Sequence, residues 1–505
     1  MPVSSLCLNL LPYCLNRFLT MFRFNTLCAF ALCALTSISA QAATSGTAPL
    51  GFADARTLLH ERADIMQVDR AEIARAESEA EAAKSLSGPK VEIDVKQVWG
   101  TKTVDMGLDT GLSSKVGPAL GNIAQNPALG QLGPQLAGAL GGALKGTDHL
   151  SVHFKQDLSG PRAALTASLP IYTGGLITAQ QQVLNHKVSE TRADRDMREN
   201  SLDAELAARY WGVQLARSVE KLHEKVLKDQ NEEVRRAKQF EKRGLISKVE
   251  RLAVEVSRDN ARRTLVNAGS DVQVAETELM KALREKSLPE LSSPLFILSG
   301  DLGTLSEWQD RARAQSPILQ KMNALRAQAG EGVRAAEASF KPKVYAFGTK
   351  NLIKHYLTLP EPDWMAGVGV TFTLWDNHDR FDKLNAAHSV VTKAEAARSE
   401  AANEIETHVE VAFLRVMQAR EDYELTGSTV ELARENLKLR EASFAEGLST
   451  ATDVDTARTK LTGSELARRA AAYKFVVSWA TLHATVGAMP DFVNSLTRAD
   501  LVVVD

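Results

Sequence analysis

The chain of 505 residues contains only four cysteines and, beyond its first 42 residues, no long apolar run. Because all four cysteines lie within the first 40 residues, the rest of the chain holds neither a disulfide nor a thiolate metal site. No run of about 18 apolar residues follows residue 42, which rules out a polytopic helical transporter. The cysteines are Cys7, Cys14, Cys28 and Cys33.

A large charge of one sign is missing too. The 60 lysines and arginines face 62 aspartates and glutamates, so the formal net charge is −2 and no nucleic-acid partner is expected. Neither metal-ligand spacing among the helical histidines nor a nucleophile elbow around a serine is present. We therefore expect no enzyme, no catalytic residue, no metal and no cofactor. The histidines considered are His223, His378, His388, His408 and His483.

The first 42 residues have the pattern of a secretory signal peptide. A short basic segment, Met21–Arg23, precedes an apolar core at Leu27–Ile38 and a small-residue cleavage site at Ala40–Ala42. Met21 is favoured as the start, because Arg23 then lies in the basic segment. The apolar core is too short for a membrane anchor, which is the alternative. The pattern predicts export and removal of residues 1–42.

An internal repeat organises the remainder of the chain. Ala164–Tyr172 aligns with Gly367–Trp375, and the tetrapeptide beginning at Gly244 aligns with that beginning at Gly447 at the same spacing. The alignment predicts a first repeat at 43–287, a linker at 288–304, a second repeat at 305–490 and a tail at 491–505. Each repeat reads as helix, strand, loop, strand, very long helix, tip and helix.

The first repeat carries an insert near residues 101–148 that the second repeat lacks. Its segment from Gly111 to Gly146 is rich in glycine and alanine and has almost no large side chain. This composition predicts a mobile loop. Because the insert lies between two strands, opposite the long helices, we expect it to face the cell exterior.

The two aligned strands alternate apolar and polar residues, and each ends in an aromatic residue, Tyr172 or Trp375. This alternation places Tyr172 on the same face as Thr166, opposite Leu165 and Ala167. Ten residues from Ala163 to Tyr172 match the 9–11 that cross a bilayer as a tilted strand. A half-buried strand of a soluble sheet has the same period and stays an alternative. Tyr345 and Phe347 take the opposite parity to Val91, Ile93 and Val95, which the sequence does not explain, whereas the pair Gly367 and Gly369 favours close strand packing.

Two very long helices are expected at Thr178–Arg243 and Phe381–Glu446, where apolar residues recur every three to four positions. At 1.5 Å per residue each approaches about 100 Å, which requires coiled-coil packing against other helices. Each helix stops at a glycine, and the next begins with a capping box. The boxes are Ser247 with Glu250 and Thr450 with Asp453.

These motifs resemble those of the TolC family of outer-membrane channel proteins. The resemblance rests on Leu169–Gly175, on Val370–Asn377 and on the two tip motifs, and it covers residues 48–490. It implies a mainly α fold with membrane β: long antiparallel coiled-coil helices form a periplasmic tunnel, and a homotrimer with four strands per protomer shares a β-barrel. The implied location is the outer membrane and its lipid, extending into the periplasm.

The resemblance also assigns residues. The adaptor-docking tips would be Gly244, Leu245, Ser247, Gly447, Leu448 and Thr450. The acidic ring of the gate falls on Asp453, with Asp455 and Glu250 as further members. A polar lock found in some members is not expected, because this chain has Phe444 and Ser449 at its positions.

The implied function is a passive exit duct in a tripartite efflux pump or a type I secretion system. Its cargo would be drugs, metals, toxins or polypeptides. A periplasmic adaptor would link it to an inner-membrane pump or ABC transporter. The alternative is a periplasmic coiled-coil scaffold or adaptor without a pore.

Overall fold

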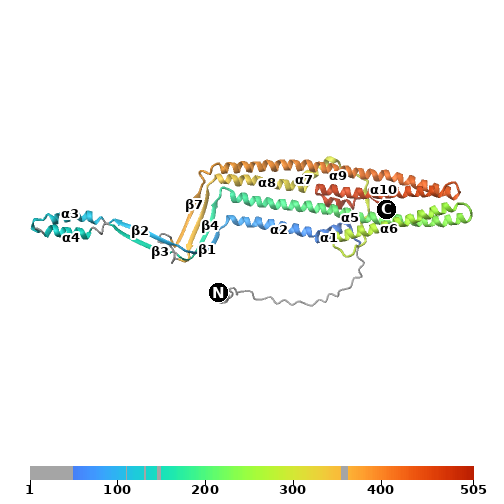
Figure 1. Cartoon of the computed structure of the whole chain (residues 1–505). Coiled ribbons are helices and arrows are strands. Elements are labelled where there is room, and N and C mark those ends of the chain that lie inside the picture. Colours follow the sequence, from blue (N-terminus) through green and yellow to red (C-terminus); the bar gives the residue numbers. More distant parts are fainter. Residues whose placement is uncertain are drawn as a thin grey trace, which may run out of the picture. The chain divides into compact units, whose positions relative to one another are not determined.

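The computed structural model describes residues 49–109, 111–129, 132–144, 149–157, 159–353 and 362–504. These belong to one compact unit, Ala48–Asp505. The predicted signal peptide lies outside the described residues. The helices and strands follow one another in the order shown in Figure 1.

The first half begins with α1 and α2, continues through strands and two short helices, and ends in a long helical hairpin. The bounds are α1 Phe52–Arg62, α2 Asp64–Lys84, β1 Lys90–Val98, β2 Thr101–Asp109, α3 Leu112–Ala124, α4 Leu132–Leu144, β3 His149–Asp157, β4 Gly160–Tyr172, α5 Leu176–Lys242 and α6 Lys248–Ala282.

From α7 to α10 the second half has the order of the first half without the insert, and it adds β5, α11 and β8. The bounds are β5 Phe296–Leu298, α7 Leu305–Gln315, α8 Pro317–Glu337, β6 Lys343–Asn351, β7 Trp364–Thr371, α9 Asp379–Ala445, α10 Ala451–Val486, α11 Met489–Ser495 and β8 Leu501–Val503.

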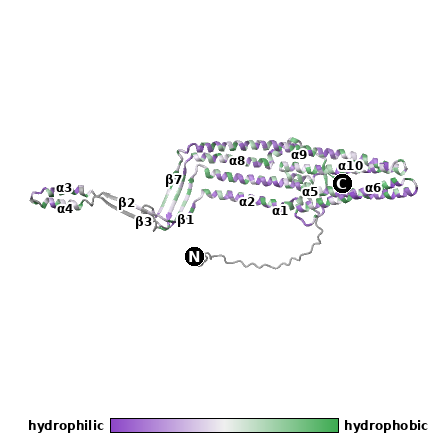
Figure 2. Cartoon of the chain, viewed as in Figure 1, coloured by the Kyte–Doolittle hydropathy of each residue, from purple (hydrophilic) through white to green (hydrophobic). Residues whose placement is uncertain are grey.

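The predicted long helices are present as α5 and α9, each of 67 residues and each beginning two residues before the expected start. In each half the long helix packs antiparallel against the helix that follows it, α6 or α10, and α2 and α8 pack against α5. Hydrophilic and hydrophobic residues are mixed along every long helix, as Figure 2 shows. Within the described part of the chain, no helix is both long enough and apolar enough to cross a membrane.

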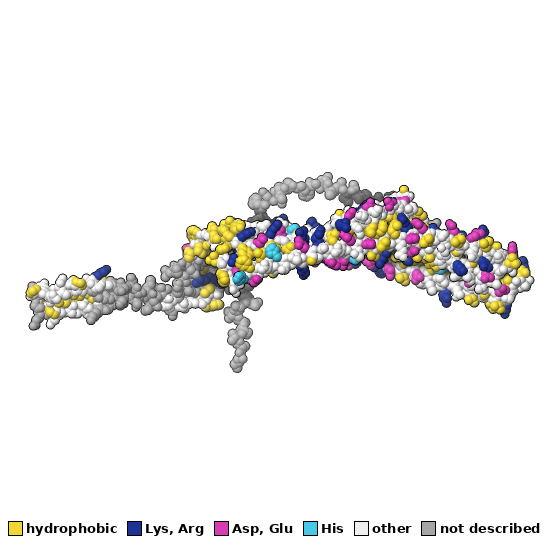
Figure 3. Space-filling model, turned by 90° about the horizontal axis from the view of Figure 1, so that it is seen from above, with side chains coloured by type: hydrophobic (Ala, Val, Ile, Leu, Met, Phe, Trp, Pro, Cys, Tyr) yellow, Lys and Arg dark blue, Asp and Glu magenta, His cyan; other side chains and the backbone are white. Residues whose placement is uncertain are grey.

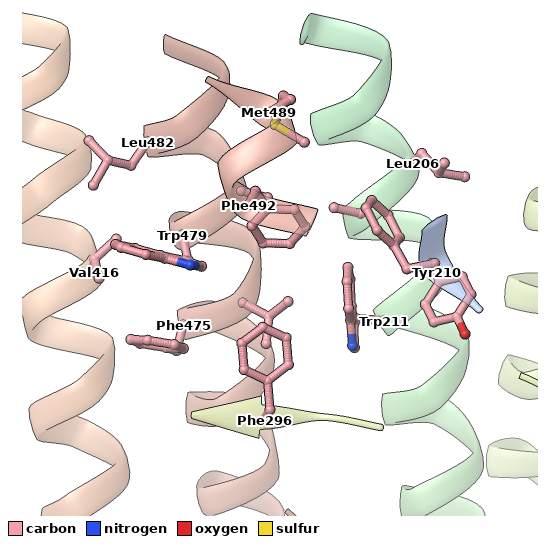
Figure 4. Packing of buried hydrophobic residues seen from close by; sticks show 14 of the residues in the cluster. Leu206, Tyr210, Trp211, Phe296, Val416, Phe475, Trp479, Leu482, Met489 and Phe492 are labelled. Carbon is pink, nitrogen blue, oxygen red and sulfur yellow. The ribbon is translucent and has the colours of Figure 1, made fainter. Parts of the chain in front are cut away.

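The main core lies where α1, α5, α10 and α11 meet the segment before α7. Trp211 of α5 and Phe492 of α11 lie close together in this core (Figure 4), with ring centres 5.7 Å apart. The ring centre of Phe52 is 4.7 Å from that of Trp211. The hydroxyl of Tyr210 donates to the carbonyl oxygen of Leu50 at 2.7 Å and accepts from the backbone N–H of Ser293 at 3.0 Å. This buried hydroxyl therefore has a partner both as a hydrogen-bond donor and as an acceptor.

The segments predicted as a linker and a tail are parts of this core rather than connections. Leu295–Leu298 is buried, and β5 pairs antiparallel with β8 from the chain end. Phe492 of α11 is fully buried among the aromatic residues. A run of four apolar residues in a stretch without helical period must be covered by other elements, and the chain end covers it.

The four-stranded sheet has the order β1-β4-β6-β7, and all neighbours are antiparallel. Its register aligns one apolar row across the sheet, which runs through Val91, Ala167, Gly348 and Ala366. The neighbouring row points to the other face and runs through Glu92, Thr166, Thr349 and Met365. The alternation therefore continues in register across the sheet, except that Tyr345, Phe347 and Met365 lie on the polar face. Hydrophobic side chains gather at the sheet end of the long helices on the face seen in Figure 3.

One residue departs from the predicted parity. A register irregularity between Pro170 and Tyr172 pairs Tyr172 with Val344, which belongs to the apolar row, whereas the sequence placed Tyr172 with Thr166 on the polar face. Proline has no N–H for the ladder and is found at such bulges. The extra residue moves the aromatic ring to the apolar side.

The predicted mobile loop is wrong, because the insert is structured. β2 and β3 pair with each other, and α3 and α4 pack together beyond them. In α4 a leucine recurs at every fourth position from Leu132 to Leu144. This spacing is typical of a helix and outweighs the glycine content, on which the prediction of a loop was based. A Cβ on Gly133 would lie 2.8 Å from the carbonyl oxygen of Ile123, so this glycine lets α4 approach α3 closely.

Candidate functional site: the hairpin tips and the sheet ends

The first candidate elements are the turns that join α5 to α6 and α9 to α10. Gly244 has a φ of +71° and Gly447 a φ of +75°. At both turns the third residue after the helix hydrogen-bonds back to it: Leu245 N–H donates to the Phe240 carbonyl at 2.9 Å, and Leu448 N–H donates to the Ser443 carbonyl at 2.8 Å. These are Schellman-type caps. A Cβ on either glycine would meet nothing within 4 Å, so glycine is required by its backbone angle and not by space.

Each cap leaves a leucine in solvent. Leu245 is 65% exposed and Leu448 is 78% exposed. The hydrophobic residue of a Schellman cap often packs back on its own helix, whereas both of these leucines point into solvent.

The predicted capping boxes are present at both tips. Ser247 N–H donates to Oε2 of Glu250 at 2.8 Å, and Glu250 N–H donates to Oγ of Ser247 at 3.2 Å. At the second tip, Oδ2 of Asp453 accepts from the backbone N–H of Thr450 at 3.0 Å and from its hydroxyl at 2.7 Å, and also from the hydroxyl of Ser449 at 3.3 Å. The Thr450 N–H, helped by both hydroxyls, lowers the pKa of Asp453. Asp453 is therefore a fixed negative charge.

Asp455 has a different environment from the other two predicted acids. Its Oδ1 accepts from the amide Nε2 of Gln230, a buried residue of α5, at 3.0 Å. Asp455 thus ties the second hairpin to the first within one chain, whereas Glu250 and Asp453 each cap their own helix.

Sequence reasoning missed a buried ion-pair network just above the tips. Arg458 of α10 is only 6% exposed, and its guanidinium pairs with Glu233 of α5 at 3.2 Å and with Glu441 of α9 at 2.6 Å. Burial opposes the charged form of Arg458, but the attraction of Glu233 and Glu441 outweighs it and raises the pKa. Phe240 and Phe444 pack between the same hairpins with ring centres 6.0 Å apart. The sequence does contain a sign that Arg458 is buried: it directly follows Ala457 and lies four positions after Val454, which is a helical spacing, and both of these residues are on the buried face of α10.

The sheet ends carry aromatic residues on both sides. Tyr172 is the last residue of β4, whereas Trp375, which the sequence placed at the end of its strand, lies four residues after β7 ends at Thr371; both are exposed. Trp99 and Trp364, which the sequence analysis did not single out, lie at the other end of β1 and β7 and are exposed too. Aromatic residues at both ends of an outward apolar band are typical of a strand that crosses a membrane.

Two polar clusters lie away from the tips. Among the described residues, His60, Glu199 and Asp203 offer ligand atoms within 4.8 Å of one another. Arg56 already pairs with Asp203 at 2.7 Å and with Glu199 at 3.3 Å, so its guanidinium supplies the positive charge that a metal ion would bring. We interpret this cluster, which joins α1 to α5, as the neutralisation of the fully buried Asp203.

His483 is a buried polar residue within the core. It is 2% exposed, and its Nδ1–H donates to the Trp479 carbonyl at 2.9 Å. Its ring stands 4.3 Å from that of Trp479 and 5.0 Å from that of Trp308, beside a cavity of 430 Å³. Burial lowers the pKa of His483 to about 4. The side chain is therefore a neutral part of the core at neutral pH.

The family model described as outer membrane efflux protein matches residues 56–284 and 308–488. Similar solved structures include the CmeC outer membrane channel of Campylobacter jejuni, with a TM-score of 0.65 at 11% identity over 88% of this chain and 89% of that chain.

The outer membrane protein VceC of Vibrio cholerae gives a TM-score of 0.65 at 12% identity, over 87% and 96% of the two chains. The open-state MtrE outer membrane channel of Neisseria gonorrhoeae gives 0.61 at 16% identity, over 87% and 89%. No curated protein matches the sequence.

Proposed function

Because the chain belongs to the outer membrane efflux protein family, we propose that three copies form one passive exit duct through the outer membrane and the periplasm. The observation that carries this proposal is the sheet, which is open at β1 and β7 and apolar along one face. Unpaired strand edges are not tolerated in lipid, so β7 of one copy must pair with β1 of the next.

The band between the aromatic ends fits the hydrocarbon layer. β1 and β6 have nine residues each, close to the 9–11 that a tilted strand needs. Val91, Ile93, Val368 and Val370 are each more than half exposed on the apolar face. Such exposure over a whole face is costly in water and favourable in lipid. Four strands from each of three copies then close a twelve-stranded barrel.

The tips are proposed as the docking surface for a periplasmic adaptor that links the duct to an inner-membrane pump or ABC transporter. Two equivalent turns expose Leu245 and Leu448 beyond the helix ends. The capping residues Ser247 and Thr450 follow two positions later. The caps hold these turns in one conformation, so an adaptor would meet a preformed surface. The cargo is small molecules exported from the cell, as in efflux; secretion of polypeptides is the other transport mode of such a duct.

The gate is proposed at Asp453. Three-fold symmetry brings three copies of this carboxylate towards one axis, and the depressed pKa keeps each one charged. Its capping role explains its presence in one chain, and the ring would add a function in the trimer. Glu250 has the same geometry in the first hairpin, whereas Asp455 is engaged with Gln230 and contributes less to an axial ring.

Gel electrophoresis of the detergent-solubilised membrane fraction, heated and unheated, tests the assembly. We expect a trimer band in the outer-membrane fraction that collapses to monomer on heating, and stepwise ion currents when the trimer is added to a planar bilayer. A protein that stays soluble without detergent and gives no current would instead be a periplasmic scaffold.

A further inference from the structure

The polar face of the sheet carries a group of large apolar side chains that the rest of that face lacks. Phe347 pairs with Gly367, and Tyr345 pairs with Gly369. Met365 pairs with Thr349 in the next row and is 50% exposed. The three side chains therefore follow one another along β6 and β7.

Two glycines make room for the rings. A Cβ on Gly369 would lie 2.5 Å from Cζ of Tyr345, and a Cβ on Gly367 would lie 3.3 Å from Cζ of Phe347. Each ring thus lies over the missing side chain of its cross-strand partner, on the polar face. This arrangement explains the opposite parity of Tyr345 and Phe347 and the purpose of the glycine pair. The ring centres are 6.0 Å apart.

Filling the space above a glycine stabilises a sheet, and that role alone would account for a covered ring. Tyr345 remains 39% exposed, so the side of its ring that faces away from the sheet is open. On β1 the charged residues of this face pair among themselves: Lys90 lies 2.6 Å from Glu92, and Lys96 lies 3.2 Å from Asp94. On β6, Lys343 lies on the same face two positions before Tyr345. The rings of Tyr345 and Phe347 are thus the part of the face that can stack against an aromatic surface.

We propose that Tyr345, Phe347 and Met365 form an apolar subsite that binds the planar ring of an aromatic compound passing through the barrel. The inference rests on the proposed function, because this face lines a pore only when three copies close the sheet. Two tilted rings offer stacking and edge contacts, and the thioether of methionine packs well against aromatic rings. A trimer would carry three such subsites.

The test uses the purified trimer in a planar bilayer carrying a potassium current. Acridine orange, a planar aromatic cation, is compared with tetraethylammonium, which has the same charge and no ring. We expect acridine orange to interrupt the current and Phe347→Leu to weaken this block by about three- to tenfold, the range of one aromatic contact. Block by tetraethylammonium should be the same in both proteins.

Matched glycine variants separate ring position from pore width. Gly369→Ala should displace the Tyr345 ring and weaken the acridine block, although it removes no side chain. Gly348→Ala is the same change in the apolar row, where the new Cβ would meet its nearest atom at 3.9 Å, and it should leave the block unchanged. Unheated gels check that every variant is a trimer.

Unchanged acridine block in Phe347→Leu and Gly369→Ala would overturn the subsite and leave the pore intact. Trimers that carry no potassium current at all would overturn the proposed function, and this inference with it.

Discussion

Helix α10 joins two regions that use their residues in opposite ways. At its start, near the tip, apolar Leu448 is exposed and charged Asp453 is used to cap the helix. Near its end, Trp479 and His483 are buried in the aromatic core. The tip is stabilised by hydrogen bonds within a few residues, whereas the core depends on residues from distant elements. Because local motifs hold the tip in shape, its surface stays available for binding. The aromatic core holds the helices together without any contribution from the tip residues.

The largest expected effect on function is on docking. Leu448→Asp should weaken binding of the trimer to its periplasmic adaptor by about tenfold or more, because an exposed apolar contact is replaced by a charge. The trimer itself should persist, since Leu448 takes no part in the core clusters that the described residues form. Surface-immobilised adaptor would measure the affinity, and Leu132→Asp, at a similarly exposed leucine of α4, is the control. Loss of the trimer band in Leu448→Asp would show that the tip is a folding element.

Removing Arg458 from its ion pairs with Glu233 and Glu441 should give the largest change in stability. Arg458→Met leaves Glu233 and Glu441 facing each other without the buried cation, which costs about 3–5 kcal/mol of unfolding free energy. Arg251, which bridges Glu241 and Glu255 within the first hairpin alone, is the matched arginine, and Arg251→Met should cost much less. Denaturant unfolding in detergent measures both. Equal losses would mean that Arg458 does not join the hairpins.

The core should respond to pH through His483. Its folded pKa of about 4 lies below the ordinary value of 6.5, so the unfolded chain binds more protons between these values. Stability should therefore fall as the pH decreases from about 6.5 to about 4, by about 2 kcal/mol per protomer at pH 5. His483→Gln should lose this share of the pH dependence. Unfolding curves at pH 7 and pH 5 would show it, and identical slopes in both proteins would contradict the assignment.

The smallest structural effect is expected at Asp453. Asp453→Asn keeps an acceptor for Thr450, so the trimer should lose little stability, while three charges leave the proposed ring. Single-channel recordings should then show lower cation selectivity and weaker block by divalent ions. Glu250→Gln, at the equivalent cap of the first hairpin, is the comparison. If selectivity stays constant in Asp453→Asn and only the melting temperature falls, Asp453 is a helix cap without a gating role.

Elements governed by short-range pattern could be predicted closely. The ends of α5 and α9, the glycine turns and the capping boxes all depend on residues within one or two helical turns. The insert was misjudged because its many glycines suggest a loop, whereas the leucines of α4 have a helical spacing and Gly133 allows close contact with α3. Tyr172 was misplaced because a bulge depends on the partner strand, which the local sequence does not contain.

The sequence by itself determined the order of helices and strands, the alternating faces of the strands and the chemistry of the tips, because each follows from hydrophobic period or from hydrogen bonds between near neighbours. Only the tertiary structure decided that Arg458 finds Glu233 and Glu441, that β5 pairs with β8, and that Tyr345 and Phe347 lie over Gly369 and Gly367. These contacts join residues far apart in the chain. No local preference specifies them, so they form only when the packing of the helices and the register of the sheet bring their partners together.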